Sequence, residues 1–484
     1  MFNLKNSSWI YILSFLFIAL NAVFIALESY YFVLIPVVLL ILILAVFSFD
    51  KLIWLTVFLV PFSVPLRFIR PDLGFDVHLP TELLLFGIMV LFILKQAITG
   101  KFDPKISNHP VSLAIYINLF WLFITSLTST MPIVSMKFFL ARLWYVLVFY
   151  FLLTQLFKKR KNIVNFFWVY LIPLSIVIIY ILVRHAGYGL YNQQASHWVP
   201  RPFFNDHTSY GAVLAMFIPG IAGMFYLYKD QGKTRIIIGF IMVLFSMALL
   251  FSYTRAAWVS LAGAIGVWAV IKLKIKFKYI AVFATAILIV FLSFRTEIFI
   301  YLKENRQASS TDLKEHVKSI ANIATDASNL ERINRWSSAL RMFEEKPFFG
   351  FGPGTYMFKY APFQRSYEKT IISTNLATLG GAHSEYFGPL AESGILGMLS
   401  FLLIIGVTIY TALRVYRFSD NKYVRIIVLS CLTGLITYYI HGFLNNFLDT
   451  DKASAPFWGF TAIIVTLDVY YRKKQQGEKE NEAA

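Results

Sequence analysis

The chain has 484 residues, of which 58% are hydrophobic and 14% are charged, and its mean hydropathy is +0.65. A water-soluble domain cannot bury so much apolar surface, so the composition excludes that class and predicts a membrane protein. The net charge of +18 is divided among short basic clusters between apolar segments, which indicates membrane orientation and argues against a nucleic-acid partner. The single cysteine, Cys431, excludes an internal disulfide and a cysteine-cluster metal site.

Apolar segments long enough to cross a bilayer recur along the whole chain, since such a helix needs about 20 residues. We predict an all-α polytopic protein with about twelve to fourteen spans, the first of them an uncleaved span rather than a signal peptide. The third and fourth segments are short and flank "PFSVPLRFIRPDLGFDVHLP" (61–80), so one or two are expected to be re-entrant or interfacial. The expected starts lie near Trp9, Tyr31, Leu52, Pro80, Pro110, Lys137, Ile163, Ser209, Ile236, Ala256, Tyr279, Tyr386, Val424 and Pro456.

Membrane orientation follows from the short loops that carry Lys and Arg, because such loops stay in the cytoplasm. Alternation from a cytoplasmic N-terminus places five basic segments inside, and it predicts that both termini are cytoplasmic. These segments are "KKRK" (158–161), "KDQGKTR" (229–235), "KLKIKFK" (272–278), "RVYRFSDNKYVR" (414–425) and "RKKQQ" (472–476).

The chain divides into four parts on this reading. Residues 1–294 form an N-terminal transmembrane bundle, 295–382 a large periplasmic loop, 383–471 the C-terminal transmembrane helices, and 472–484 a polar, disordered cytoplasmic tail. The loop should be partly helical, because Ser328 and Glu331 match an S-x-x-E capping box. Apolar residues then recur at helical spacing until the breakers Pro347 and Gly350. These apolar residues are Ile333, Trp336, Leu340 and Phe343.

Arginines on the expected outer face are the first candidates for chemistry, because guanidinium matches phosphate oxygens. They are Arg255, Arg332, Arg335 and Arg201. Alternatively, Arg255 reaches the lipid headgroups, and the two loop arginines belong to a solvated helix. Asn205 and His207 stand beside Arg201 before a span, where polar residues line a cavity or cap a helix.

His383 lies between "GGA" and "SEY" at the outer start of a span. An isolated histidine near an interface is most often structural, yet imidazole also titrates near neutral pH and can take or orient a hydroxyl proton. Several outer arginines, one such histidine and a large loop would suit a reaction that expels an anionic phosphate group.

Two further patterns have plainer explanations. "GFGPG" (350–354) lacks the K-[ST] of a nucleotide loop and indicates a turn or a backbone amide nest. Asp449 and Asp451 form a D-x-D spacing, which would bind a metal ion or, more simply, cap a helix.

Four motifs, taken in order, resemble the O-antigen ligase and polymerase superfamily. They are "RPFFNDHTSYGAVLAMFIPG", "SYTRAAW", "ERINRWSSALRMFEEKPFFGFGPGTY" and "AHSEYFGPLAESGILG", within roughly residues 200–440. Two positions depart from the pattern: Ser384 stands where Asn is common, and Asp206 with His207 follow Asn205.

The resemblance implies a GT-C-like inner-membrane glycosyltransferase that works without a metal or cofactor. It implies inverting transfer of a glycan from undecaprenyl diphosphate, on the periplasmic face, to an acceptor hydroxyl such as a lipid A core sugar. His383 corresponds to the histidine that activates the acceptor, and Arg255 and Arg332 to arginines that engage the diphosphate; Arg335 is the weaker match. Supporting roles fall to Asn205, His207, Trp336, Ser384 and Glu385.

Three other functions stay open at this point. A polymerase would join lipid-linked repeats, and a protein O-oligosaccharyltransferase would use a protein hydroxyl. A transporter of lipid-linked glycans would explain the span count, but it predicts midplane charges and internal repeats, which the sequence lacks.

Overall fold

The computed structural model describes residues 7–72, 76–100, 102–276, 327–369 and 380–472, with Ser373 and scattered positions between 278 and 294. The span expected from Tyr279, the loop up to residue 326 and the tail from 473 therefore lie largely or wholly outside the described residues. The chain forms two compact units, which divide between Thr56 and Val57.

The first unit contains α1 (Ser7–Ala26), η1 (Tyr31–Leu34), α2 (Ile35–Phe47) and the start of α3 (Phe49–Leu59). Phe32 of η1 stacks on Phe24 of α1, with ring centroids 4.8 Å apart. Most large side chains of α1 and α2 are exposed, as expected for helices surrounded by lipid. The segment expected to start near Leu52 is indeed short, because α3 has only 11 residues.

The second unit is built almost entirely of helices, with one two-stranded hairpin in which Val64 pairs with Leu79. Its N-terminal elements are η2 (Val60–Phe62), β1 (Val64–Pro65), η3 (Leu66–Phe68), β2 (His78–Leu79), α4 (Thr81–Thr99), α5 (Pro104–Ser107), α6 (Pro110–Leu127), α7 (Pro132–Val146), the π-helix η4 (Leu147–Leu152), α8 (Leu153–Phe157), α9 (Arg160–Ala186) and α10 (Gln193–Ser196). The others are α11 (His207–Leu227), α12 (Gly232–Phe251), α13 (Arg255–Lys272), α17 (Ala327–Glu345), α18 (Tyr356–Lys359), η5 (Ala361–Phe363), η6 (Ser366–Glu368), α19 (Phe387–Phe418), α20 (Lys422–His441) and α21 (Asp451–Tyr470).

Ten helices of the described residues are long and apolar enough to span a bilayer, which confirms an all-α polytopic membrane protein. Two shorter apolar helices lie in the first unit. The fourth segment, expected to be short, is a 19-residue helix, α4.

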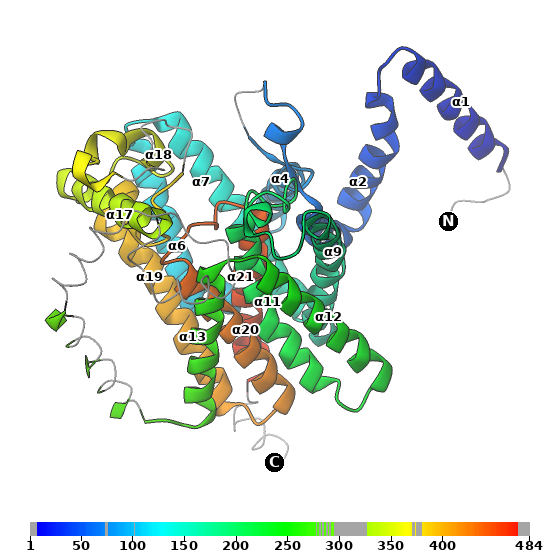
Figure 1. The fold of residues 1–484 in the computed structure, drawn as a ribbon. Helices are drawn as coiled ribbons and strands as arrows, with labels where there is room; N and C mark the ends of the chain where they lie inside the picture. Colours follow the sequence, from blue (N-terminus) through cyan, green and yellow to red (C-terminus); the bar gives the residue numbers. More distant parts are fainter. Residues whose placement is uncertain are drawn as a thin grey trace. The chain divides into compact units, whose positions relative to one another are not determined.

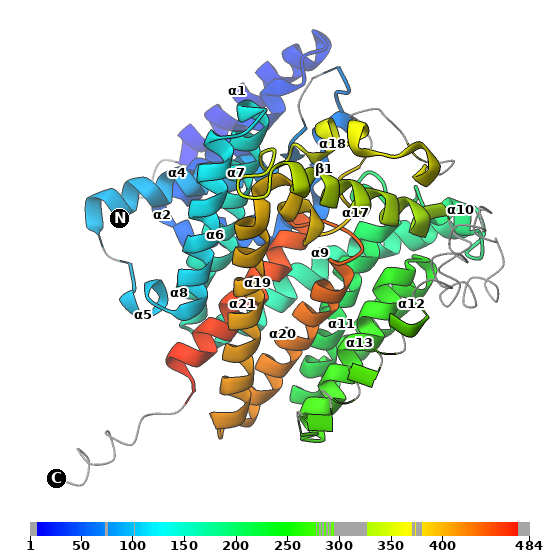
Figure 2. The ribbon, with the colours of Figure 1, turned by 90° about the vertical axis from the view of Figure 1, so that its left-hand side faces the viewer.

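Three helices form the centre of the bundle. Within the apolar window of each span, 89% of α21, 78% of α20 and 72% of α11 is buried, against 22% of α13. Burial on all sides does not make α21 uniformly apolar, since it also buries Asp451, Lys452 and Asp468. Figures 1 and 2 show α20 and α21 among the other long helices of this unit.

Chain direction brings several helix ends together at one end of this unit. α11, α13, α19 and α21 begin there, and α12 and α20 end there, since each span connects opposite ends of the bundle. α17 and α18 lie at the same end as the hairpin (Figures 1 and 2). The basic segments 158–161, 229–235 and 414–425, together with Arg472, consequently belong to the opposite end of these helices.

The predicted loop helix is confirmed as α17, and polar residues are among those that it buries. Leu340 is 41% exposed, whereas Asn334, Arg335 and Ser338 are buried. These polar groups are buried because they are hydrogen-bonded: Asn334 donates to Gln364, and Ser338 donates to the carbonyl of Asn334. The alternative in which the loop arginines belong to a solvated helix is therefore wrong for Arg335, which is buried.

The "GFGPG" segment forms a turn that docks into a break in α19. Gly394 interrupts α19 with a φ of 69°, and the amides of Phe351 and Gly352 donate to the carbonyls of Ala391 and Glu392 at 3.1 and 2.8 Å. Backbone amides near this turn also bind the carboxylate of Glu392, with the amide of Tyr356 donating at 2.9 Å. The amides near this turn are thus bonded by a carboxyl group of the chain itself.

Candidate functional site

The connection between α20 and α21, residues 442–450, is the common anchor of the candidate site; we call it the α20–α21 loop. The carboxylate of Glu385 accepts hydrogen bonds from the amides of Phe447 and Leu448, both at 2.9 Å, and from the hydroxyl of Tyr438 at 2.6 Å. The Glu385 amide donates to the carbonyl of Gly442 at 2.7 Å. Glu385 therefore fixes the start of α19 against this loop.

His383 stands in an unusual backbone conformation just before α19. Its φ is 50°, in the left-handed region, and Gly380 before it also has a positive φ of 85°. The indole N–H of Trp336 donates to the carbonyl of His383 at 3.5 Å. A Cβ at Gly380 would come within 3.2 Å of the His383 Nε2 atom, so the glycine lets the imidazole lie close to the backbone at residue 380.

Burial and two nearby cations keep the imidazole of His383 neutral. Burial is the larger cause, and the charges of Arg332 and Arg335 add to it, so the pKa of His383 falls to about 3 despite the opposing charge of Asp206. A neutral imidazole can accept a proton or a hydrogen bond from a hydroxyl group.

Arg332 and Arg255 bring two positive charges to the same place. The Nε of Arg332 donates to the carbonyl of Leu444 in the α20–α21 loop at 3.0 Å. Burial lowers the pKa of Arg332 to about 10, which leaves it protonated at neutral pH, and Asp206 opposes that shift. Arg255, the first residue of α13, lies near enough to interact electrostatically with Arg332. We call Arg255, Arg332 and His383 the arginine–histidine cluster.

Arg335 is engaged by the protein itself. Its Nε pairs with Glu331 at 2.8 Å, its Nη1 donates to the carbonyl of Gly380 at 2.7 Å, and its guanidinium lies 4.6 Å from the ring centre of Tyr360. Because the side chain is buried and already bonded to the chain before His383, these contacts favour a positioning role over direct contact with diphosphate.

The segment before α11 lies beside the cluster. Asp206 caps α11, accepting from the amides of Thr208 and Ser209 at 2.9 and 2.8 Å. Burial raises its pKa, but the charge of His207 and these hydrogen bonds more than offset that effect and keep the pKa below its usual value. The ring of His207 stacks on His197, with centroids 4.2 Å apart. Of the candidates in this segment, Arg201 is the exposed one.

Two other predicted residues have structural contacts. The Ser384 hydroxyl accepts from the amides of Tyr386 and Phe387 at 3.2 and 3.3 Å and so caps α19. Trp336 packs between Phe387 and Phe443, with centroids 5.4 and 5.5 Å away.

The two carboxylates of the D-x-D pattern have different surroundings. Asp451 is fully buried, accepts from the hydroxyls of Ser63 and Thr81 at 2.5 Å, and lies 3.7 Å from the ammonium of Lys452. Asp449 is exposed in part. Loss of hydration is the larger cause that raises its pKa to about 6, and the charge of Glu385 is the next. Across the described residues no group of three His, Cys, Asp or Glu side chains could hold a metal ion.

Residues 240–402 match the family model of the O-antigen ligases. The resemblance to the O-antigen ligase and polymerase superfamily is confirmed. The match contains the whole arginine–histidine cluster and Arg335, and it ends before the α20–α21 loop. No curated protein matches the chain. The chain is thus a multi-pass membrane protein that contains a region matching the O-antigen ligase family model.

Sequence reasoning missed several residues beside this O-antigen ligase domain. The amide of Asn445 approaches the Nε2 of His441 at 3.2 Å, and the charges of Arg332 and Asp206 both act on this buried imidazole. Arg67 donates to the side-chain oxygen of Asn205 at 2.6 Å. Arg67 belongs to the segment flagged for its Pro and Arg content, which was the one available signal; nothing local singled out His441.

Proposed function

We propose that the protein is a glycosyltransferase that transfers a glycan from undecaprenyl diphosphate to a hydroxyl of the lipid A core. The observation that carries the proposal is the neutral imidazole of His383 within electrostatic reach of Arg332, which in turn interacts with Arg255. Two guanidinium groups suit a diphosphate leaving group, and a neutral imidazole suits an acceptor hydroxyl.

In the proposed step the acceptor oxygen forms a bond to the anomeric carbon while the bond from that carbon to the diphosphate oxygen breaks, with inversion. The hydroxyl proton passes to His383, and the electron pair leaves with the diphosphate. Arg255 and Arg332 stabilise the charge that grows on the leaving group. The anionic donor also offsets the positive charge that lowers the pKa of His383, so the imidazole becomes a stronger base once the donor is bound.

These arginines take the role that a metal ion has in other glycosyltransferases. Transfer should therefore continue when a chelator is present. If chelation abolished transfer and a divalent cation restored it, the proposal would be wrong, and Asp449 and Asp451 would become the candidates.

The site faces the periplasm in this proposal, with both termini in the cytoplasm of a bacterium and the protein in its inner membrane. Support comes from the basic segments, which belong to the helix ends opposite the arginine–histidine cluster. Single cysteines introduced at exposed positions in a Cys431→Ser background test the orientation. A cysteine that replaces Phe443 should react with a membrane-impermeant thiol reagent in intact spheroplasts, and a cysteine that replaces Asp230 should not.

A transfer assay on the purified full chain separates the possible functions. Lipid-diphosphate oligosaccharide is supplied with and without lipid A core, and product that requires the core identifies a ligase. Ladders formed without core would identify a polymerase, and transfer only to a protein would identify an O-oligosaccharyltransferase. Movement of lipid across vesicles without any transfer would identify a transporter.

A further inference from the structure

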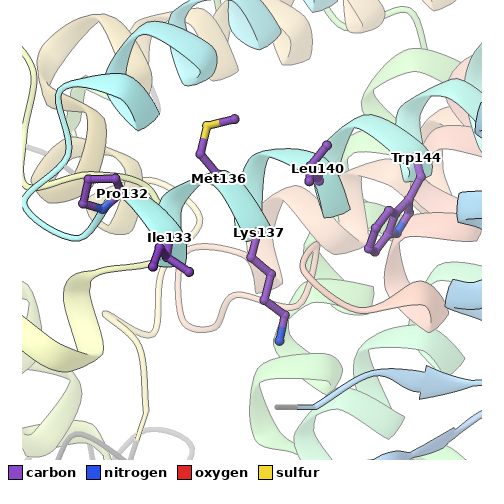
Figure 3. A pocket seen from close by; sticks show the side chains of 6 residues that line it. All are labelled: Pro132, Ile133, Met136, Lys137, Leu140 and Trp144. Carbon is purple, nitrogen blue, oxygen red and sulfur yellow. The ribbon is translucent and has the colours of Figure 1, made fainter. Parts of the chain in front are cut away.

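An apolar groove of about 450 Å³ runs along the outward face of α7. The residues that line it are Pro132, Ile133, Met136, Lys137, Leu140 and Trp144 (Figure 3). Ile133 is 88% exposed, so the groove is open on its outer side. In a membrane-spanning helix such a groove faces hydrocarbon, and it fits an apolar chain better than a sugar.

Lys137 is the one charged residue of this groove. Its side chain extends away from α7 on the side where Ile133 and Trp144 also lie (Figure 3). The ammonium donates to the backbone carbonyl of Asp76 at 3.2 Å. The carboxylate of Asp76 is instead paired with Arg67, whose Nε is 3.2 Å away. Within the described part of the chain, Lys137 therefore has no carboxylate at ion-pair distance.

Positive charge continues from Lys137 toward the arginine–histidine cluster. Arg67 bonds the side chain of Asn205 at 2.6 Å, and the Nε of Arg201 bonds the carbonyl of Asn205 at 3.2 Å. The guanidinium groups of Arg67 and Arg201 lie 5.4 and 5.9 Å from the ring centre of Phe68. We call Lys137, Arg67 and Arg201 the cationic track.

The cationic track connects the groove with the cluster through adjacent residues. Asn205 directly precedes Asp206, whose charge acts on both Arg332 and His383. The carboxylate of Asp206 is turned toward the amides of α11, and Asp76 is the one carboxylate at ion-pair distance from the cationic track among the described residues. Three cations facing one anion leave a net positive charge beside an apolar groove.

We propose that the α7 groove and the cationic track bind a polyprenyl phosphate. The hydrocarbon chain lies along α7, and phosphate oxygens meet Lys137 and Arg67, with Arg201 nearer the cluster. A lysine offers a point charge and an arginine a planar pair of donors, which together suit a phosphate at the membrane interface. The inference rests on the proposed function in one respect, because it assigns this surface to the lipid carrier of the glycan donor.

Binding of undecaprenyl monophosphate tests this assignment without any reaction, because that lipid carries no glycan. The full chain is placed in phosphatidylcholine nanodiscs, and lipid bound is measured by native mass spectrometry. The double change Lys137→Gln with Arg67→Gln should weaken binding by about tenfold or more, as expected for the loss of a charge-assisted hydrogen bond. Leu140→Trp, which fills the groove, should weaken it through the hydrocarbon chain instead.

Two control variants each remove one exposed positive charge outside the cationic track. Arg70→Gln alters an exposed arginine that pairs with Asp72, close in sequence to Arg67. Lys229→Gln alters an exposed lysine beside Asp230, on the α11–α12 connection. Neither change should alter the binding of undecaprenyl monophosphate.

The outcomes separate the polyprenyl phosphate from ordinary phospholipid. Unchanged binding of undecaprenyl monophosphate in both the double variant and Leu140→Trp overturns the inference. The inference is also overturned if the variants lose binding of dioleoyl phosphatidic acid but keep binding of undecaprenyl monophosphate, because the surface would then belong to a phospholipid. His383→Ala should bind normally. Wild-type protein that binds the lipid at this surface but transfers no glycan would refute the proposed function and leave this inference intact.

Discussion

His383 combines a left-handed backbone with an imidazole that resists protonation. A φ of 50° costs a residue other than glycine about 1 to 2 kcal/mol. Such strain persists where surrounding contacts hold it, and here Trp336 bonds the His383 carbonyl while Arg335 bonds the carbonyl of Gly380. The strain therefore coincides with the residue to which the proposed mechanism assigns the proton.

Replacing His383 by Asn should separate chemistry from stability, because Asn tolerates the left-handed region. His383→Asn should lower the transfer rate by roughly a hundredfold to ten-thousandfold, the usual contribution of a general base, without lowering the unfolding midpoint. His383→Gly, which relieves the backbone strain, should be at least as stable as wild type and equally slow. Transfer at the normal rate by either variant would contradict the role of His383.

The lowered pKa of His383 predicts a pH effect with a definite sign. The unfolded chain binds a proton near pH 6.5, whereas the folded chain does so only near pH 3, so the unfolded state binds more protons in between. The fold should thus lose stability as the pH falls from about 6.5 to about 3, because His383 is protonated more readily in the unfolded chain. The His383→Asn variant should lose less stability over the same range. Histidine-selective NMR should show a neutral ring at pH 6, and inorganic pyrophosphate should raise its pKa. A ring that titrates near pH 6.5 without ligand would contradict this.

At the scale of elements, two features hold the cluster: the contact of α17 with residues 380–383, and the break in α19. The chain at Pro347 and Phe348, just before the GFGPG turn, fits into that break because Gly394 has no side chain. Arg335 holds the other feature, through Glu331 and the carbonyl of Gly380. Both features position the backbone of the protein and need not contact the substrate.

Arg335→Lys should lower kcat by roughly tenfold to a hundredfold, because lysine keeps the charge but loses the planar set of donors. The donor KM should change little if Arg335 acts through the chain before His383. Arg341→Lys is the matched control, since Arg341 lies on the same helix and pairs with Glu368 at 2.6 Å. Steady-state kinetics of both variants decide the point. A large rise in donor KM for Arg335→Lys would instead indicate direct contact with diphosphate.

Gly394→Ala should destabilise the protein by more than about 1 kcal/mol, since its φ of 69° disfavours alanine and a Cβ would collide with the carbonyl of Phe348. Gly406 provides the control on the same helix, because a Cβ there meets nothing within 4 Å. Gly406→Ala should be neutral or stabilise by about 0.5 to 1 kcal/mol. Thermal unfolding in detergent measures both changes. Equal midpoints for the two variants would contradict the docking of the turn into α19.

Local patterns predicted the helices well and the long-range contacts poorly. α6 begins at Pro110 as expected, because apolar length and a helix-starting proline are both local signals. The contact of Arg67 with Asn205 joins residues 138 positions apart, and that of Glu385 with Leu448 joins residues 63 positions apart. No periodicity or spacing carries such pairs, so the cluster came from the family resemblance and its surroundings only from the structure.

At the scale of the whole molecule, the buried central helices α11, α20 and α21 carry the site on their ends. α20 and α21 present the α20–α21 loop, which Arg332 and Glu385 bind from the α17 and α19 sides. The bundle thereby holds two arginines and one neutral imidazole at a single end. The apolar groove on α7 and the cationic track approach that end from the lipid side.

The most direct measurement is glycan transfer from undecaprenyl diphosphate by the folded full chain in the presence of a chelator. Wild type and Arg341→Lys should both transfer. Arg332→Gln should be slower by roughly a hundredfold to a thousandfold, the usual loss for one such charge-stabilising donor. His383→Asn should be comparably slow. Normal rates in both Arg332→Gln and His383→Asn, with folding verified, would contradict the assignment of the arginine–histidine cluster as the catalytic site.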